Sequence, residues 1–120
     1  MHLTQNLRRG DIVRVRLDPV VGSEQGGERP VLVISPDHVN EHSPVILAAS
    51  ITNRKEERVY AFEARIEPPE GGLSRMSKVS LMQLRSIDKQ RIIGRYQRIS
   101  TETMTRVEAA LRIATGLYRL

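Results

Sequence analysis

Two predicted strands are joined by the stretch Pro19-Val20-Val21-Gly22-Ser23-Glu24-Gln25-Gly26-Gly27-Glu28-Arg29-Pro30, and this connection decides the fold. Its three glycines let the backbone adopt positive φ angles or approach a ligand closely, and a proline stands at each end. The stretch also carries hydroxyl, amide, carboxylate and guanidinium groups. It is therefore either a solvated hairpin loop or part of a functional site.

The segments around this loop have the side-chain patterns of strands. Residues 12–17 alternate apolar side chains with Arg14 and Arg16, which predicts a half-buried strand. Residues 31–35 form an apolar run, typical of a central strand covered on both faces. Further strands are predicted at residues 45–52, 58–66, 79–82 and 92–99, with a single helical turn at residues 88–91. Short strands with glycine and proline between them indicate a compact, strongly curved antiparallel sheet.

The periodicity changes from 2 to 3.6 residues after residue 100, which predicts a C-terminal helix. Ser100 or Thr101 is its expected N-cap, and Glu102 is favourable in the first turn. The apolar stripe of this helix consists of Met104, Val107, Leu111, Ala114 and Tyr118. The fold class is thus mainly β with a C-terminal helix (α+β).

Size and composition narrow the class of protein. With 120 residues we expect one domain, residues 1–120. Aromatic residues make up 3% of the chain, too few for several stacked RNA bases as in RRM or cold-shock domains. The absence of cysteine excludes disulfides and thiolate metal sites. The chain begins without the apolar segment of a signal peptide and has no membrane-length apolar run, so we expect a cytoplasmic protein.

The charge balance is basic, with a formal net charge of +5 that comes mostly from arginine. Arginine binds phosphate through two parallel hydrogen bonds and stays charged at any working pH. A basic surface also occurs on many soluble proteins without a nucleic-acid ligand. The charge is therefore compatible with a nucleic-acid partner but does not establish one.

Several motifs occur together along the chain. Arg9-Gly10-Asp11 opens the first strand, and Asp18-Pro19 and then Gly22-Ser23-Glu24-Gln25-x-Gly27-x-Arg29-Pro30 follow it. Residues 48–52 (Ala-Ala-Ser-Ile-Thr) and 83–91 (Gln-Leu-Arg-Ser-Ile-Asp-Lys-Gln-Arg) continue the series. Over about residues 7–118 the chain resembles the MazF/PemK family of toxin endoribonucleases.

This resemblance implies a fold, an activity and partners. The implied fold is an SH3-like barrel, usually a homodimer that binds RNA in concave surfaces at the dimer interface. The implied activity is sequence-specific cleavage of single-stranded RNA without a metal ion, by the toxin of a type II toxin–antitoxin pair. An acidic, MazE-like antitoxin peptide is the implied inhibitor, and no cofactor is implied.

A site with catalytic metal ions has little support in the sequence. Two-metal nucleases use clustered carboxylates, but Asp11 and Asp18 stand at opposite ends of a strand, about 20 Å apart. His38 and His42 have helical spacing, but they lie in a segment that holds Pro36 and Pro44, where we expect no helix.

A metal-free reaction needs less, because RNA carries its own nucleophile, the 2′-OH. The enzyme has only to align this hydroxyl with the adjacent phosphate, transfer protons and stabilise charge. Arg29 is suited to hold a phosphate oxygen, and Thr52 to donate a hydrogen bond to it; the resemblance matches both to catalytic residues. Glu24 is a candidate base that would need a raised pKa, or it braces the loop by pairing with Arg29. The resemblance gives no such role to Glu28, where family members carry a basic residue.

A second group of residues is suited to bind RNA rather than to react with it. Amide, hydroxyl and guanidinium groups match base edges of unpaired RNA, and basic side chains on loops would line the rim of the groove. The first set consists of Ser23, Gln25, Gln83 and Arg85, and the second of Arg54, Lys55, Arg75 and Lys78.

Two other functions remain open on the same fold. A CcdB-like gyrase inhibitor would need a C-terminal tryptophan, and this chain contains no tryptophan. A passive RNA-binding module would explain the charge, but not the match at Arg29 and Thr52.

Overall fold

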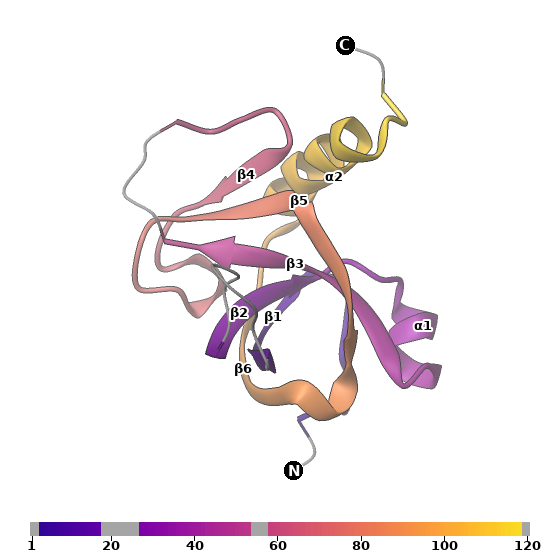
Figure 1. Ribbon diagram of the computed structural model, residues 1–120. Coiled ribbons are helices and arrows are strands. Elements are labelled where there is room, and N and C mark those ends of the chain that lie inside the picture. The colour runs from indigo at the N-terminus through magenta and orange to yellow at the C-terminus, as the bar shows by residue number, and fades with distance from the viewer. Residues whose placement is uncertain (1–2, 18–26, 54–57, 119–120) are drawn as a thin grey trace.

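Six antiparallel strands form one curved sheet in the computed structural model, which describes residues 3–17, 27–53 and 58–118 (Figure 1). The strands are β1 (Asp11–Leu17), β2 (Gly27–Val33), β3 (Val45–Thr52), β4 (Glu63–Ile66), β5 (Ser77–Asp88) and β6 (Ile92–Arg98). They lie in the order β4-β5-β3-β2-β1-β6, so β4 and β6 are the edges of the sheet. Figure 1 shows β5 crossing the sheet and then bending sharply toward β6, which gives the barrel-like curvature. The predicted fold class is confirmed.

Within the described residues, two helices and two 3₁₀ turns accompany the sheet. They are α1 (Asp37–His42), η1 (Glu70–Gly72), η2 (Lys89–Arg91) and α2 (Thr101–Thr115). The α2 helix packs on β4 and β5. No helix among the described residues is long and apolar enough to cross a bilayer.

The central strands of the sheet are buried on both faces. One apolar core lies beneath α2 and includes Ile12, Leu32 and Ile51. The other includes Val13, Val31 and Ile87. Neighbouring residues of β1 and β2 contribute to opposite cores because successive side chains of a strand point to opposite faces. This confirms the prediction of a central strand covered on both sides.

β5 is much longer than the predicted strand at residues 79–82. Ala49 pairs with Leu84 whereas the next residue, Ser50, pairs with Ser80, so residues 81–83 form an irregularity in the ladder. Extra residues of this kind bend a strand and increase its twist. The predicted strand therefore covers only part of the first half of β5, and the second half was not predicted as a strand.

The predicted strand at residues 58–66 is too long. Glu63 donates its backbone N–H to the Tyr60 carbonyl oxygen at 2.9 Å, and its carboxylate accepts from the Tyr60 N–H, also at 2.9 Å. These two bonds close a turn, so that only Glu63–Ile66 remains as β4. The strand predicted at residues 31–35 is likewise displaced, because β2 covers Gly27–Val33.

The expectation that no helix forms between Pro36 and Pro44 is wrong. α1 occupies Asp37–His42, with Pro36 at its N-cap. A proline at a helix start loses no hydrogen bond, because the first N–H groups of a helix have no partner within it. Asn40 of α1 is fully buried and donates its amide to the Ser35 carbonyl oxygen at 2.8 Å, which ties the helix to the end of β2.

The C-terminal helix agrees closely with its prediction. The Ser100 hydroxyl accepts the Thr103 N–H at 3.1 Å, which confirms the N-cap, and Gly116 ends the helix in the left-handed conformation. Met104, Val107, Leu111 and Ala114 all pack on the core. Tyr118 does not belong to this stripe, because it lies beyond the end of the helix and is 58% exposed.

Candidate active site

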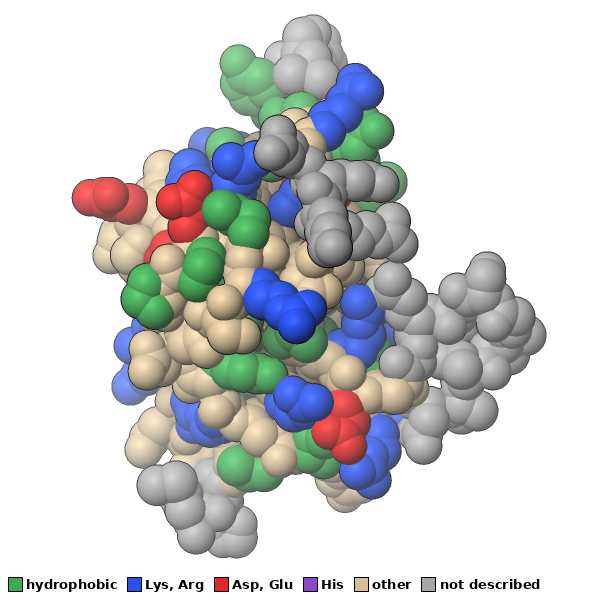
Figure 2. Space-filling view, turned by 90° about the vertical axis from the view of Figure 1, so that its left-hand side faces the viewer, with side chains coloured by type: hydrophobic (Ala, Val, Ile, Leu, Met, Phe, Trp, Pro, Cys, Tyr) green, Lys and Arg blue, Asp and Glu red, His purple; other side chains and the backbone are tan. Residues whose placement is uncertain are grey.

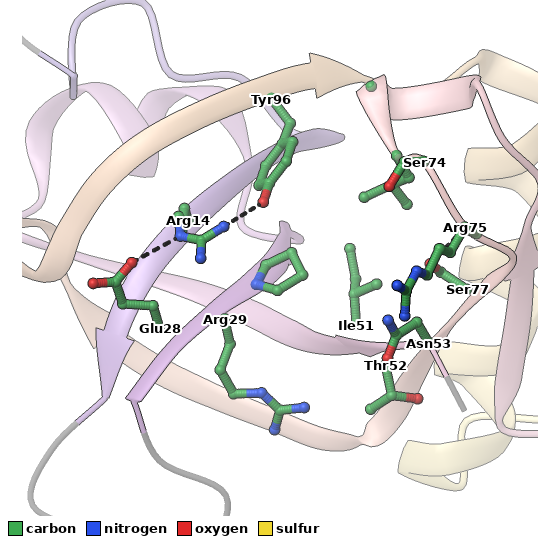
Figure 3. Close-up of a pocket in the computed structure, with 13 residues that line it drawn as sticks. Arg14, Glu28, Arg29, Ile51, Thr52, Asn53, Ser74, Arg75, Ser77 and Tyr96 are labelled. Atoms are coloured by element: carbon green, nitrogen blue, oxygen red, sulfur yellow. Dashed lines mark hydrogen bonds and ion pairs between the residues drawn. The ribbon is translucent and has the colours of Figure 1, made fainter. Parts of the chain in front are cut away.

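A cavity of about 640 Å³ opens between the ends of β2 and β3 and the segment from η1 to β5 (Figure 3). Arg14, Arg29, Thr52, Arg75 and Tyr96 are among the residues that line it. Among the lining residues that the structure describes, three side chains are arginines and one, Glu28, is acidic, so these residues give the cavity a net positive charge. Figure 2 shows Lys and Arg side chains spread over the face of the molecule toward which β3 ends.

Arg29 and Thr52 are brought together by the register of β2 and β3. Val31 pairs with Ser50, and extending this antiparallel register by two residues places Arg29 opposite Thr52. Both side chains are half-buried and line the cavity. Figure 3 shows the Arg29 guanidinium extending toward the end of β3, where Thr52 lies. A phosphate in this cavity would have a planar cation and a hydroxyl donor at one wall.

Arg14 lies beside this pair in a network that sequence reasoning missed. Its Nη1 donates to the Tyr96 hydroxyl at 2.8 Å, and its Nε donates to Glu28 Oε1 at 3.0 Å. Arg16 donates Nη2 to the other Glu28 oxygen at 3.1 Å. The signal in the sequence was the alternation that places Arg14 and Arg16 on one face of β1, but nothing local indicated that Tyr96 of β6 would join them.

Both members of the central ion pair are held in their charged forms. Hydrogen bonds from Arg14 and then Arg16 lower the pKa of the Glu28 carboxyl below its usual range. The hydrogen bonds to Glu28 and Tyr96 raise the pKa of Arg14 further. The cluster of Arg14, Arg16 and Glu28 therefore carries a net charge of about +1 at neutral pH.

Apart from Lys78, the predicted RNA-binding residues and the candidate base Glu24 fall into three groups in the structure. Arg75 is exposed and lines the cavity, as expected for a residue at the rim. Gln83 and Arg85 are exposed on β5 but do not line this cavity. Glu24, Ser23, Gln25, Arg54 and Lys55 lie outside the described residues, so their roles stay predictions.

The placement of Lys78 on an exposed loop is wrong. Lys78 belongs to β5, is only 5% exposed, and donates its ammonium to the Arg58 carbonyl oxygen at 2.7 Å. Glu63 lies 3.5 Å from the same ammonium. A buried and paired ammonium is a structural element, because moving it to a phosphate would leave the Glu63 carboxylate without its cationic partner.

In residues 3–17, 27–53 and 58–118 no three His, Cys, Asp or Glu side chains come together in a way that could hold a metal ion.

Comparison with known proteins places the chain in a family. Residues 8–115 match the family model described as "PemK-like, MazF-like toxin of type II toxin-antitoxin system". The chain is 40% identical over 111 residues to the endoribonuclease EndoA of Bacillus subtilis, covering 92% of this chain and 96% of that protein.

Solved structures agree with this match. MazF of Deinococcus radiodurans superposes with a TM-score of 0.74 at 29% identity, covering 92% of this chain and 96% of that one. A mycobacterial endoribonuclease has the same fold, with a TM-score of 0.77 at 19% identity over 97% of both chains. The chain belongs to the PemK-like, MazF-like family of toxins of type II toxin–antitoxin systems.

Proposed function

We propose that this toxin endoribonuclease cleaves single-stranded RNA sequence-specifically and without a metal ion, using the 2′-OH of the substrate as nucleophile. The observation that carries the proposal is the meeting of Arg29 and Thr52, from two neighbouring strands, in one positively charged cavity. Such a site supplies alignment and charge stabilisation, which are most of what this reaction requires.

The reaction proceeds by in-line transfer of the phosphoryl group. A base removes the 2′-OH proton, the 2′ oxygen bonds to phosphorus, and the bond from phosphorus to the 5′ oxygen breaks as that oxygen takes a proton. Arg29 and Thr52 hold the non-bridging oxygens on which negative charge grows. Glu24 is the proposed base, and Arg29 is a candidate acid. The products are a 2′,3′-cyclic phosphate and a 5′-hydroxyl.

The proposal includes the partners and location of the protein. MazF of Deinococcus radiodurans has been solved with MazE, and a mycobacterial endoribonuclease with its cognate antitoxin. We propose that an acidic antitoxin peptide likewise binds the basic cavity of this chain and blocks RNA. The single domain of residues 1–120 acts as a homodimer in the cytoplasm.

The test is to map the ends of RNA after incubation with the purified protein, with and without EDTA. We expect cleavage at a defined short sequence, unchanged by EDTA, with cyclic phosphate at the upstream end. Replacing only the scissile nucleotide by its 2′-deoxy form should abolish cleavage and leave binding nearly intact, because a multi-phosphate interface depends little on one hydroxyl. Loss of activity in EDTA, or cleavage of the 2′-deoxy substrate, would overturn the mechanism.

A further inference from the structure

Glu28 sits between two guanidinium groups in the way that a phosphate would. One carboxylate oxygen accepts from Arg14 at 3.0 Å and the other from Arg16 at 3.1 Å. Two arginines that each bind one oxygen of the same anion form a pattern that suits phosphate as well as carboxylate. The three side chains are 44%, 58% and 40% exposed for Arg14, Arg16 and Glu28, so an incoming anion can reach them from solvent.

Arg14 is also positioned from a third strand. The Tyr96 hydroxyl of β6 accepts from Arg14 Nη1, and both residues line the cavity that contains Arg29 and Thr52. Figure 3 shows Glu28, Arg14 and Tyr96 in a row along one side of this cavity. The bond to Tyr96 uses a different nitrogen from the bond to Glu28, so Arg14 stays oriented if Glu28 leaves.

We propose that Arg14, oriented by Tyr96, binds a second phosphate of the RNA next to the phosphate held by Arg29, and that Glu28 occupies this subsite until RNA displaces it. Glu28 is then an internal competitor that weakens RNA binding. The inference rests on the proposed function for the identity of the anion, a phosphate of single-stranded RNA.

A purely structural role for these residues is the alternative. Arg16 and Glu28 are register partners on β1 and β2, and opposite charges across strands commonly stabilise a sheet. That role requires neither the cavity nor Tyr96. It also predicts that removing the Glu28 charge changes RNA affinity only as much as removing an exposed carboxylate elsewhere on the surface.

The first measurement is binding of a short single-stranded RNA of mixed sequence at several salt concentrations. Arg14→Ala should weaken binding about tenfold at low salt and reduce the slope of log K against log salt by about 0.7, the value for one lost phosphate contact on a single strand. Arg112→Ala, which removes an exposed arginine of α2, is the matched control and should change neither the affinity for RNA nor this slope.

The second measurement tests the competition. Glu28→Gln should tighten binding several-fold, whereas Glu41→Gln on α1 controls for the loss of one exposed carboxylate elsewhere. In the Arg14→Ala background the gain from Glu28→Gln should largely disappear, because the contact for which Glu28 competes is gone. A general charge effect would persist in the double variant.

The results separate this inference from the proposed function. If the wild type binds RNA but does not cleave it, the proposed function fails, while the binding measurements still decide the subsite. The inference is overturned if Arg14→Ala behaves like Arg112→Ala, or if the gain from Glu28→Gln is the same with and without Arg14. Thermal unfolding of each variant identifies any that fails to fold, and Arg14→Gln then replaces Arg14→Ala.

Discussion

Lys78 of β5 is the register partner of Thr52 of β3, yet the two residues have different roles. Thr52 is half-buried at the wall of the cavity, whereas the Lys78 ammonium is turned to the Arg58 carbonyl oxygen and Glu63. Lys78 thus fixes the strand beside Thr52 and the turn that leads into β4. We therefore expect Lys78 to support the site and not to contact RNA.

Lys78→Met should therefore change stability and leave the salt dependence of RNA binding unaltered. The Glu63 carboxylate would lose its cationic partner and the Arg58 carbonyl oxygen would lose its donor, which costs about 1–3 kcal/mol. Urea unfolding measures this loss, and Lys89→Met in η2 is a control for removal of a lysine charge. If the slope of log K for RNA binding against log salt is smaller in Lys78→Met than in the wild type, Lys78 does contact RNA.

Arg29→Ala should lower the rate of RNA cleavage by about 10²-fold or more, the size expected for a group that stabilises charge in the transition state. Arg29→Lys should recover only part of the rate, because a lysine keeps the charge but not the planar fork. Single-turnover cleavage of a labelled RNA is the measurement, with Arg112→Ala as the control. Full activity in Arg29→Ala would contradict the assignment.

Thr52→Ala should reduce cleavage by roughly tenfold or more through loss of one hydrogen bond to a charged oxygen. Because the side chain is half-buried at a strand end, the domain should remain folded. Thr52→Ser keeps the hydroxyl and should retain most of the activity. If the serine variant is as slow as the alanine variant, the methyl group matters and not the hydroxyl.

Glu70 should make the start of α2 sensitive to acid. Burial raises the pKa of its carboxyl, but the hydrogen bonds from the Ser100 N–H and the Thr103 hydroxyl, each 2.8 Å long, outweigh burial and hold this pKa below 4.5. A depressed pKa in the folded state stabilises the protein above pH 4.5, and this stabilisation is lost as the pH falls further.

Glu70→Gln should accordingly destabilise the protein by about 1 kcal/mol at neutral pH. It should also flatten the decline of stability below pH 4.5. Urea unfolding over a pH series is the measurement, and Glu67→Gln, which changes an exposed neighbour, is the control. An unchanged acid dependence in Glu70→Gln would assign that dependence to other carboxylates.

The active unit should be a dimer. Large apolar side chains remain exposed on the described surface, among them Met76, Met82 and Leu117, and a chain this small gains much by burying such side chains on a second copy. Sedimentation at micromolar concentration should show about twice the 13.6 kDa of one chain. A species of one chain only, with activity retained, would contradict this prediction.

The sequence by itself determined the features that depend on neighbouring residues. Side-chain periodicity predicted the alternation in β1, the apolar run in β2 and the whole of β3. The same periodicity, together with the capping preference of Ser100, predicted the α2 helix. The motif around Arg29 and Thr52 pointed to the family because it combines many defined positions. These signals are local, so they can be recognised in the sequence without knowledge of the tertiary structure.

Only the tertiary structure decided what residues far apart in the chain do to one another. Arg14 and Tyr96 are 82 positions apart and meet because β6 returns to the edge of β1. Lys78 looked like a surface cation, yet the curvature of β5 and the turn before β4 bury it against Glu63. The order and bending of the strands determine such contacts. That order depends on the free energy gained by packing both faces of the sheet, and not on the preference of any single residue.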